Sequence, residues 1–299
     1  MAVTTLLHHL PELPKSIQLP AHLFSLLVST LQIGKGAILL PDYDENLFVP
    51  WASTGIDVTT LHRLRIPEED VDAIQARGPS GIIWENDEVR SFAPYFSRRE
   101  ASQLERILLF PFVSTGGVQA LLLLLETPYF NEQSEFLRLI LAAVGEPAAR
   151  VVQKQRLRYS DVIRRAVVFR AAELPLVIER LTERAPHGVH LVLLRLADIV
   201  SQVATANEHL DPYRVWQDLL RIVASLFAST GIVCDLDQNR LLICLHGALE
   251  DDLELIVYHI GATIAELLPE VTDVPVLRFQ SKEYPADGAD LLQLAHSLV

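Results

Sequence analysis

The chain has 299 residues and a formal net charge of −13 at pH 7, and half of its residues are apolar. A length near 300 is enough for two ordinary domains. The negative charge argues against broad contact with nucleic-acid backbones, because like charges repel. No apolar run reaches the roughly 18 residues that span a bilayer, and no Lys or Arg precedes Lys15 as a secretory signal would require. We therefore expect a cytoplasmic globular protein with no nucleic-acid partner and no membrane insertion.

The first half of the sequence predicts a mixed α/β unit after a loose start. Residues 1–16 carry two prolines and little periodicity, so we expect an N-terminal lead-in there. Apolar spacing and turn residues define the elements that follow. In chain order they are a helix at about 21–31, strands at 36–41 and 46–51, an irregular stretch at 55–105, strands at 107–113 and 118–125, and a helix that buries Phe136, Leu139, Ile140, Ala143 and Val144.

The end of this unit carries a family resemblance. Two buried strands, 108–113 and 117–124, follow one another and lead into an exit helix that continues past Ala148. This closing run and the order of elements before it resemble a GAF domain, a small-molecule or interaction sensor of the PAS-like class, over residues 17–157. The resemblance implies an antiparallel sheet with helices and a ligand pocket between the sheet and residues 55–105. A fold by itself names no ligand.

Side chains around that stretch are the candidates for the pocket lining. The alternative for the aromatic residues is ordinary core packing, and for the histidine it is a surface position. The candidate ligand-pocket residues are Trp51, Trp84, Phe92, Tyr95, Phe96 and His62.

Residues 158–186 predict a helical linker between two domains. A break is expected near Pro175, because proline removes a backbone donor. A linker helix of this kind commonly pairs with its copy, so we expect a homodimer, although strict heptads are not sustained.

The second half, residues 187–299, predicts the element order βααββαβα. Its central feature is a hairpin over 231–245, two apolar strands around a polar tip at 237–240. A two-residue turn at the tip would place Cys234 opposite Ile243 and Cys244 on the other face of the sheet. A disulfide between these two cysteines would then have poor geometry, so we expect both thiols to be reduced.

This order of elements resembles the palm of a diguanylate cyclase (GGDEF-type) domain almost end to end. The stretches at 207–223 and 284–295 are similar to the family's conserved helix and its Tyr-Pro-x-Asp ending. The chain as a whole is thus expected to be an α/β (α+β) protein of two domains, a GAF/PAS-like antiparallel sheet with helices and then a cyclase-palm-like domain.

The resemblance also shows which residues stand at the family's metal-binding and phosphate-binding positions. Cyclising two triphosphates needs acidic side chains that hold divalent metals. Here the first strand ends with Arg195 and Ala197 about where two acids belong. At the hairpin tip, Asp237 and Gln238 fall on the two glycines, Asn239 and Arg240 on the acidic pair, and Leu241 on the phenylalanine. Because a cation repels a metal ion, we expect a catalytically inactive domain with no metal and no cofactor.

Two further observations bear on ligands. The family's product-inhibition site, Arg-x-x-Asp, would fall near residues 228–231, which carry neither charge. A metal site in shifted register remains an alternative, with Asp198, Asp235 and Asp237 as ligands, because Asp235 and Asp237 have the same strand parity.

The main functional hypothesis is a catalytically inactive signalling or regulatory protein, not an enzyme, that binds a protein partner or a small ligand such as a nucleotide. The resemblance implies a setting in cyclic-di-GMP-related bacterial signalling. One alternative is a small-ligand sensor that uses the GAF pocket, with a second domain that dimerises. The other is a nucleotidyl cyclase with a shifted metal site.

Overall fold

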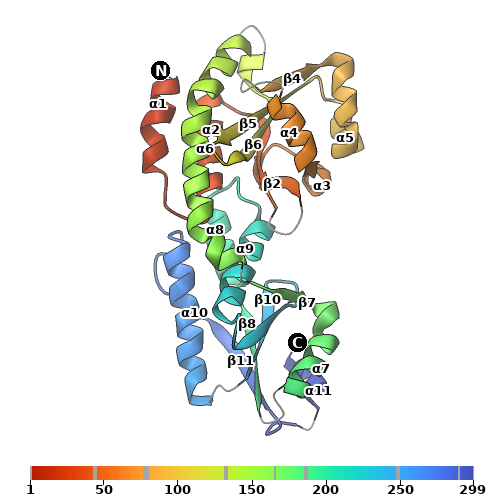
Figure 1. Cartoon of the computed structure of the whole chain (residues 1–299), viewed down its shortest axis with the longest axis vertical. Coiled ribbons are helices and arrows are strands. Elements are labelled where there is room, and N and C mark those ends of the chain that lie inside the picture. Colours follow the sequence, from red (N-terminus) through yellow and green to blue (C-terminus); the bar gives the residue numbers. More distant parts are fainter. Residues whose placement is uncertain are drawn as a thin grey trace. The chain divides into compact units, whose positions relative to one another are not determined.

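The computed structural model describes residues 2–42, 46–76, 81–130, 134–164, 166–184, 188–246, 250–288 and 290–298. The chain divides into two compact units, Met1–Arg158 with Asn207–Asp211, and Tyr159–Ala206 with Pro212–Val299. Each unit has one β-sheet with helices against it (Figure 1), so the expected mixed α/β class is confirmed. No helix among the described residues is both long and apolar enough to cross a bilayer.

The first unit is built on a six-stranded antiparallel sheet with the strand order β3-β2-β1-β6-β5-β4. The two central strands are long and almost wholly apolar, which is typical of strands buried on both faces. The strands are β1 (Lys35–Pro41), β2 (Leu47–Thr54), β3 (Ile66–Pro67), β4 (Ile82–Glu85), β5 (Arg106–Ser114) and β6 (Gly117–Glu126).

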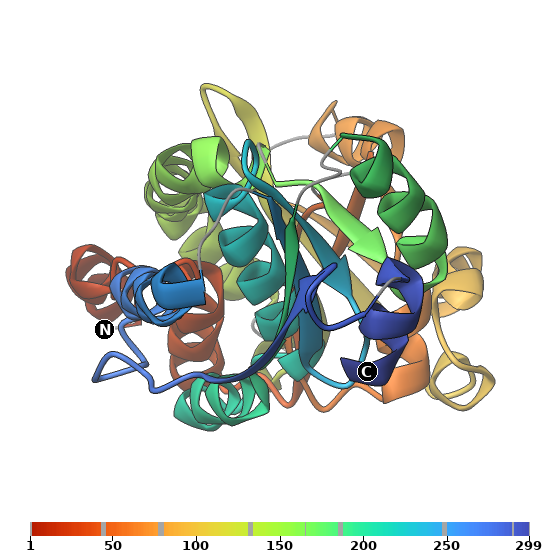
Figure 2. The same ribbon diagram turned by 90° about the horizontal axis from the view of Figure 1, so that it is seen from below.

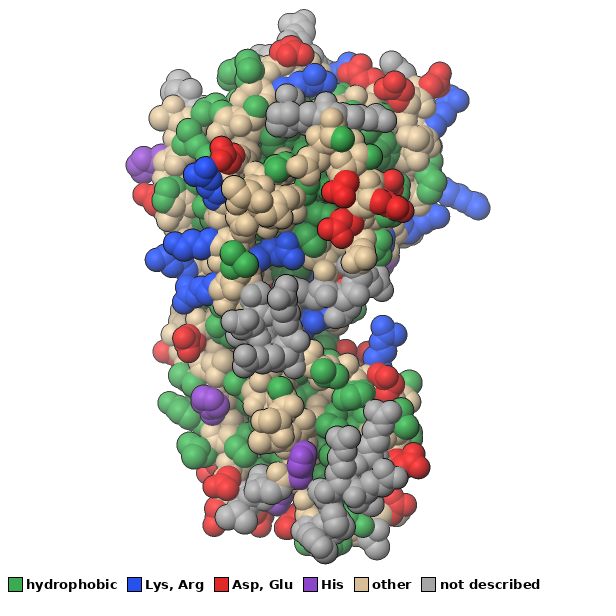
Figure 3. All heavy atoms as spheres, in the orientation of Figure 1, with side chains coloured by type: hydrophobic (Ala, Val, Ile, Leu, Met, Phe, Trp, Pro, Cys, Tyr) green, Lys and Arg blue, Asp and Glu red, His purple; other side chains and the backbone are tan. Residues whose placement is uncertain are grey.

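Helices cover both faces of this sheet. Figure 1 shows α2 (Leu19–Leu31) and α6 (Ser134–Arg164) on one side and α3 (Val58–Arg63), α4 (Glu68–Ala76) and α5 (Arg98–Ala101) on the other. A 3-10 helix, η2 (Asn86–Tyr95), joins the second group. Acidic side chains gather over α4 (Figure 3), whose first turn carries three carboxylates. Negative charge at a helix N-terminus is stabilising, because the helix dipole is positive there.

The first residues differ from the expected loose lead-in. They form α1 (Ala2–His9) and a 3-10 turn, η1 (Leu10–Glu12). Leu6 and Leu10 are buried, with 1% and 3% of their surface exposed. The segment is ordered because these two leucines reach the unit's apolar interior, an effect of tertiary packing that a short sequence with weak periodicity does not reveal.

The second unit has a five-stranded sheet with the order β11-β8-β10-β9-β7. The predicted order βααββαβα is confirmed. Its elements are β8 (Val189–Arg195), α8 (Ala197–Ala206), α9 (Pro212–Leu226), β9 (Gly231–Asp235), β10 (Arg240–His246), α10 (Leu253–Leu267), β11 (Arg278–Tyr284) and α11 (Leu291–Leu298), with a short 3-10 turn, η5 (Glu250–Asp252), before α10.

The segment expected as a helical linker is not helical throughout. Beyond the end of α6, β7 (Val168–Arg170) pairs in parallel with β9. It is followed by a 3-10 turn, η4 (Ala171–Glu173), and by α7 (Leu174–Arg184). A run of three residues carries little periodicity, and its strand conformation depends on the free edge of β9, which supplies the hydrogen-bonding partners.

One core cluster of the second unit lies between its sheet and helices α7 and α11. Alternate residues of β8 and β10, namely Leu191, Leu193, Leu242 and Cys244, pack there with side chains of α7 and α11. Seen from below (Figure 2), α7 and α11 lie on one face of the sheet and α9 and α10 on the other. The residues between them along each strand point to the α9 face, because successive side chains alternate.

Candidate functional site

The hairpin tip of the second unit adopts an unusual backbone for its residue types. Asp237, Gln238 and Asn239 all have positive φ, at 63°, 52° and 58°. This left-handed conformation favours glycine, because other residues bring Cβ close to the backbone. The resemblance places glycines at the first two of these positions. The chain therefore keeps a glycine-type turn while it carries side chains where the family has none.

Arginines line up across the sheet beside this tip. Arg240 of β10 is the ladder partner of Arg195 of β8, and Arg195 is also the partner of Arg278 of β11. Directly opposite residues share one face of a sheet, with Cβ atoms about 5 Å apart. Arg195 and Arg278 are exposed and Arg240 is half-buried. We call these three residues the arginine row. They bring positive charge to the place where the resemblance would require metal-binding carboxylates.

Asp235 lies on the opposite face of the sheet from the arginine row. Its Oδ1 accepts hydrogen bonds from the Trp216 indole at 3.2 Å and from the Asp237 backbone N–H at 2.9 Å. Burial raises the pKa of Asp235 above its ordinary value. An acid with a raised pKa in the folded state binds its proton more tightly there. Protonated Asp235 therefore contributes stability below its unfolded-state pKa. This contribution is lost as the pH rises from the unfolded-state pKa through the higher folded-state pKa.

The other predicted signature positions are split between surface and core. Ala197 and Asp198, in the first turn of α8, are exposed, whereas Leu241 is fully buried opposite Leu194. Across the described parts of the chain, three metal-ligating groups come within 4.8 Å of one another only at His8, His9 and Glu12, all of them exposed. The set of Asp198, Asp235 and Asp237 forms no such group.

A cavity of about 290 Å³ lies where the resemblance would place the product-inhibition site. Ala228, Ser229 and Gly231 contribute to its wall. The rest of the wall is apolar apart from His246: Val167, Phe169, Val177, Leu181, Ala224, Ile232 and Val233. A wall of this composition lacks the cation that a phosphate would need.

The loop at 207–211, part of the family-like stretch, packs in the first unit. The Ser53 backbone N–H donates to the His209 carbonyl at 2.8 Å, and Leu210 forms a β-bridge with Ala52. The Asn207 side chain accepts a hydrogen bond from Ser25 at 3.1 Å. These contacts give Asn207 and His209 a structural role.

The strand register at the two cysteines differs from the prediction. The turn has three left-handed residues, so Cys234 lies opposite Leu242 and Cys244 lies opposite Ile232. An added turn residue shifts the register by one, so both thiols lie in one core cluster instead of on opposite faces. They are free and buried, and burial raises the pKa of Cys234 to about 12 and that of Cys244 well above its usual range.

The candidate pocket residues of the first unit fall into three places. Trp84, Phe92 and Tyr95 form a chain of aromatic contacts, with ring centroids 4.5 Å and 6.2 Å apart, against the core that contains Phe96. Trp51 is buried elsewhere and donates to the Gln18 side chain at 3.2 Å. His62 is exposed. Of the six predicted residues, the structure thus brings together four, namely Trp84, Phe92, Tyr95 and Phe96.

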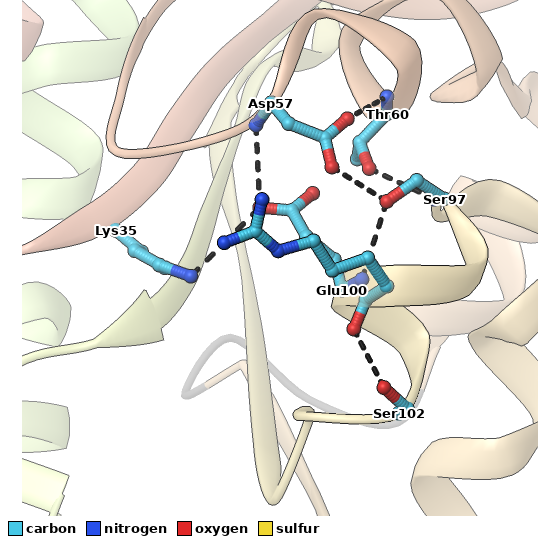
Figure 4. Close-up of polar contacts among 7 residues, drawn as sticks. Lys35, Asp57, Thr60, Ser97, Glu100 and Ser102 are labelled. Carbon is cyan, nitrogen blue, oxygen red and sulfur yellow. Dashed lines mark hydrogen bonds and ion pairs between the residues drawn. The ribbon is translucent and has the colours of Figure 1, made fainter.

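A polar cluster close to this core was not predicted (Figure 4). The Asp57 carboxylate caps α3 by accepting from the Thr60 backbone N–H at 2.8 Å, and it accepts from the Ser97 hydroxyl at 2.5 Å. These hydrogen bonds, that from Ser97 first, lower the pKa of Asp57. Ser97 caps α5 through the Glu100 backbone N–H at 3.2 Å. The Ser/Asp cap residues were the only sequence signal for this cluster.

Comparisons with known proteins give weak likenesses. A family model described as "Uncharacterised protein N-terminal domain" matches residues 5–144. The GAF domain of a phosphoenolpyruvate-protein phosphotransferase from Coxiella burnetii is similar to 53% of this chain over 95% of its own length, with 14% identity and a TM-score of 0.40. No curated protein sequence matches the chain.

A second kind of likeness spans both units. PelD from Pseudomonas aeruginosa PAO1 covers 99% of this chain and 94% of its own, with 18% identity and a TM-score of 0.30. PelD from strain PA14, solved in complex with c-di-GMP, has the same coverage, 20% identity and a TM-score of 0.29. Scores this low carry no argument about function.

Proposed function

We propose that this chain is a non-catalytic regulatory protein whose second unit binds a phosphate-bearing small molecule at the arginine row. One observation supports the proposal above all, the ladder register that sets Arg240, Arg195 and Arg278 side by side. Like charges directly opposite one another are destabilising. A bound anion would offset this repulsion, and guanidinium groups match the geometry of phosphate oxygens.

The same register argues against nucleotide cyclisation. That reaction needs carboxylates to hold the metal ions that neutralise triphosphate. The positions that the resemblance assigns to acids carry Arg195, Ala197, Asn239 and Arg240 instead. The Asp237 and Gln238 side chains occupy the turn where phosphate would approach bare backbone. Asp235, one of the three ligands of the alternative metal site, already accepts two hydrogen bonds.

A cyclic dinucleotide is one phosphate ligand to test, because the sequence resemblance suggests that signalling setting. The cavity beside residues 228–231 is a poor candidate for it, since its wall is apolar. We therefore assign any phosphate contact to the arginine row. The packed aromatic residues of the first unit lend no support to the alternative of an aromatic ligand pocket.

Two measurements test the proposal. Pure protein incubated with GTP and Mg²⁺ or Mn²⁺ is expected to form no dinucleotide product. Calorimetric titration without metal is expected to show saturable binding of at least one of GTP, inorganic pyrophosphate and cyclic di-GMP. Arg195→Gln and Arg278→Gln should each weaken that binding at least tenfold, since a hydrogen bond to a charged group contributes about 1.5–3 kcal/mol.

The matched control is Arg98→Gln, an exposed arginine of α5 in the first unit, which should leave binding unchanged. Dinucleotide product would contradict the absence of catalysis. Failure of all three anions to bind, or equal weakening by the Arg98 variant, would contradict the arginine row as their site. Binding of an acidic peptide alone would also reject a small phosphate ligand.

The homodimer is also part of the proposal, and we assign its contact to α6. Phe136 and Leu139 are 48% and 67% exposed, and Ala143 continues their row along the helix. Leu139→Glu is expected to shift the protein from dimer to monomer in sedimentation velocity, because it places a charge in an apolar contact. Glu135→Gln, on the same turn but outside the row, serves as the control. A wild-type monomer at micromolar concentration would reject the dimer.

A further inference from the structure

Glu100 is a buried carboxylate with one unused oxygen. The residue is 5% exposed. Its Oε1 accepts from the Asp57 backbone N–H at 3.2 Å and lies 3.9 Å from the Lys35 ammonium. Its Oε2 is buried without a hydrogen-bond partner among the described residues. A buried polar atom without a hydrogen bond is destabilising, and more so when it is charged. None of the described residues donates a hydrogen bond to this oxygen, so it is available to a bound ligand.

The surrounding contacts hold Glu100 in place. Figure 4 shows Lys35 reaching toward it from β1, while Asp57, Thr60 and Ser97 form a connected group on its other side. The Glu100 backbone N–H donates to Ser97. The side chain is thus positioned by a network that engages its backbone and Oε1 and leaves Oε2 for another group.

Glu100 lines a cavity of about 230 Å³ at the end of the first unit's sheet. Leu104 and Leu125 supply apolar wall, and Glu105 and Glu126, both exposed, lie toward solvent. A Cβ placed on Gly34 would come within 3.1 Å of the Glu126 carboxylate, which locates that group beside β1. The complete lining is Lys35, Glu100, Gln103, Leu104, Glu105, Leu125 and Glu126, three carboxylates against one ammonium.

We propose that this cavity binds a small organic cation, a primary amine with a short apolar body, whose ammonium donates to Glu100 Oε2. An ammonium or guanidinium group supplies both the missing donor and the charge that three carboxylates favour. The apolar wall suits a carbon chain, as pockets for small molecules combine apolar walls with a few convergent polar groups. A divalent metal fits less well, because these carboxylates form no group at ligand spacing among the described residues.

Calorimetric titration of the full chain with 1,4-diaminobutane tests this site. Saturable binding is expected, with 1,4-butanediol, its uncharged analogue, binding at least tenfold more weakly. Glu100→Gln keeps the shape and can still accept from Asp57, so it should fold normally and weaken diamine binding at least tenfold. Glu69→Gln, an exposed residue of α4, is the control and should change nothing.

Each other outcome overturns the site. These are absence of saturable diamine binding, equal binding by the diol, equal binding by the Glu100 variant, or displacement of the diamine by Mg²⁺ at equimolar concentration. If Glu100→Gln does not fold, Glu105→Gln and Glu126→Gln together must weaken binding at the cavity mouth. The site is in the first unit and does not depend on the arginine row, so either proposal can fail without the other.

Discussion

Replacing Trp216 with alanine is expected to lower the free energy of unfolding of the second unit by about 3–5 kcal/mol, the cost of truncating a buried aromatic side chain. Trp216 is 4% exposed on α9, and its indole donates to Asp235 beneath the hairpin. The substitution removes both the packing and one of the two donors to a partly desolvated carboxylate. Urea titration followed by circular dichroism measures the loss, and hydrogen exchange assigns it to this unit.

Trp216→Phe separates the two contributions. It keeps most of the ring and removes only the indole donor, so it should cost about 1–2 kcal/mol. Equal losses in the two variants would show that the ring itself contributes little, contrary to its burial. Hydrogen exchange in Trp216→Ala should increase first at the hairpin, because the contact under Asp235 is lost.

Replacing Phe96 with alanine is expected to destabilise the first unit by about 3–5 kcal/mol. Phe96 is 1% exposed and belongs to the core on the α4 face of the sheet. Its truncation leaves a void that the surrounding structure closes only in part, which is why large-to-small changes in a packed core are costly. Thermal and urea unfolding at pH 7 measure the effect.

The result also decides between core and pocket for this residue. A side chain that lines an open ligand pocket would enlarge existing space when truncated, at a cost below about 1 kcal/mol. Phe92, which is half-buried, is the matched control, and Phe92→Ala should cost less than half as much as Phe96→Ala. A small loss at Phe96 would restore the expectation of an aromatic ligand pocket.

The hairpin shows how far sequence reasoning reaches. Apolar runs on either side of a polar tip predicted both strands, and β9 and β10 confirm them. The turn was expected to have two residues and has three in the left-handed conformation. That single residue moved Cys234 and Cys244 onto one face, because side chains alternate strictly along a strand.

Helix α6 shows a similar limit. Its periodicity predicted a helix with Phe136 and Leu139 on the buried side, yet both are exposed. Ala143, also expected to be buried, is exposed as well, whereas Ile140 and Val144 are buried as predicted, together with Leu137 and Leu141. Apolar residues occur on more than one side of this helix. Contact with the sheet, where Gly145 meets the Phe110 ring of β5, determines which side is buried.

The two candidate sites differ in how visible they are in the sequence. The sequence singled out Arg195 and Arg240 because the resemblance places them where acids would be expected. Arg278 joins them only through the pairing of β11 with β8. Nothing in the sequence predicts that the side chain of Glu100 is buried. Its burial depends on residues 43 and 65 positions earlier in the chain, Asp57 and Lys35.

The sequence by itself determined the mixed α/β class, the order of elements in the second unit and the place of the hairpin. These properties depend on local composition and on periodicity, which short-range physics makes readable. Only the tertiary structure decided strand register, the buried side of α6, the strand within the linker, the arginine row and the burial of Glu100. Each of these depends on contacts between residues far apart in the chain, whose energies local patterns do not record.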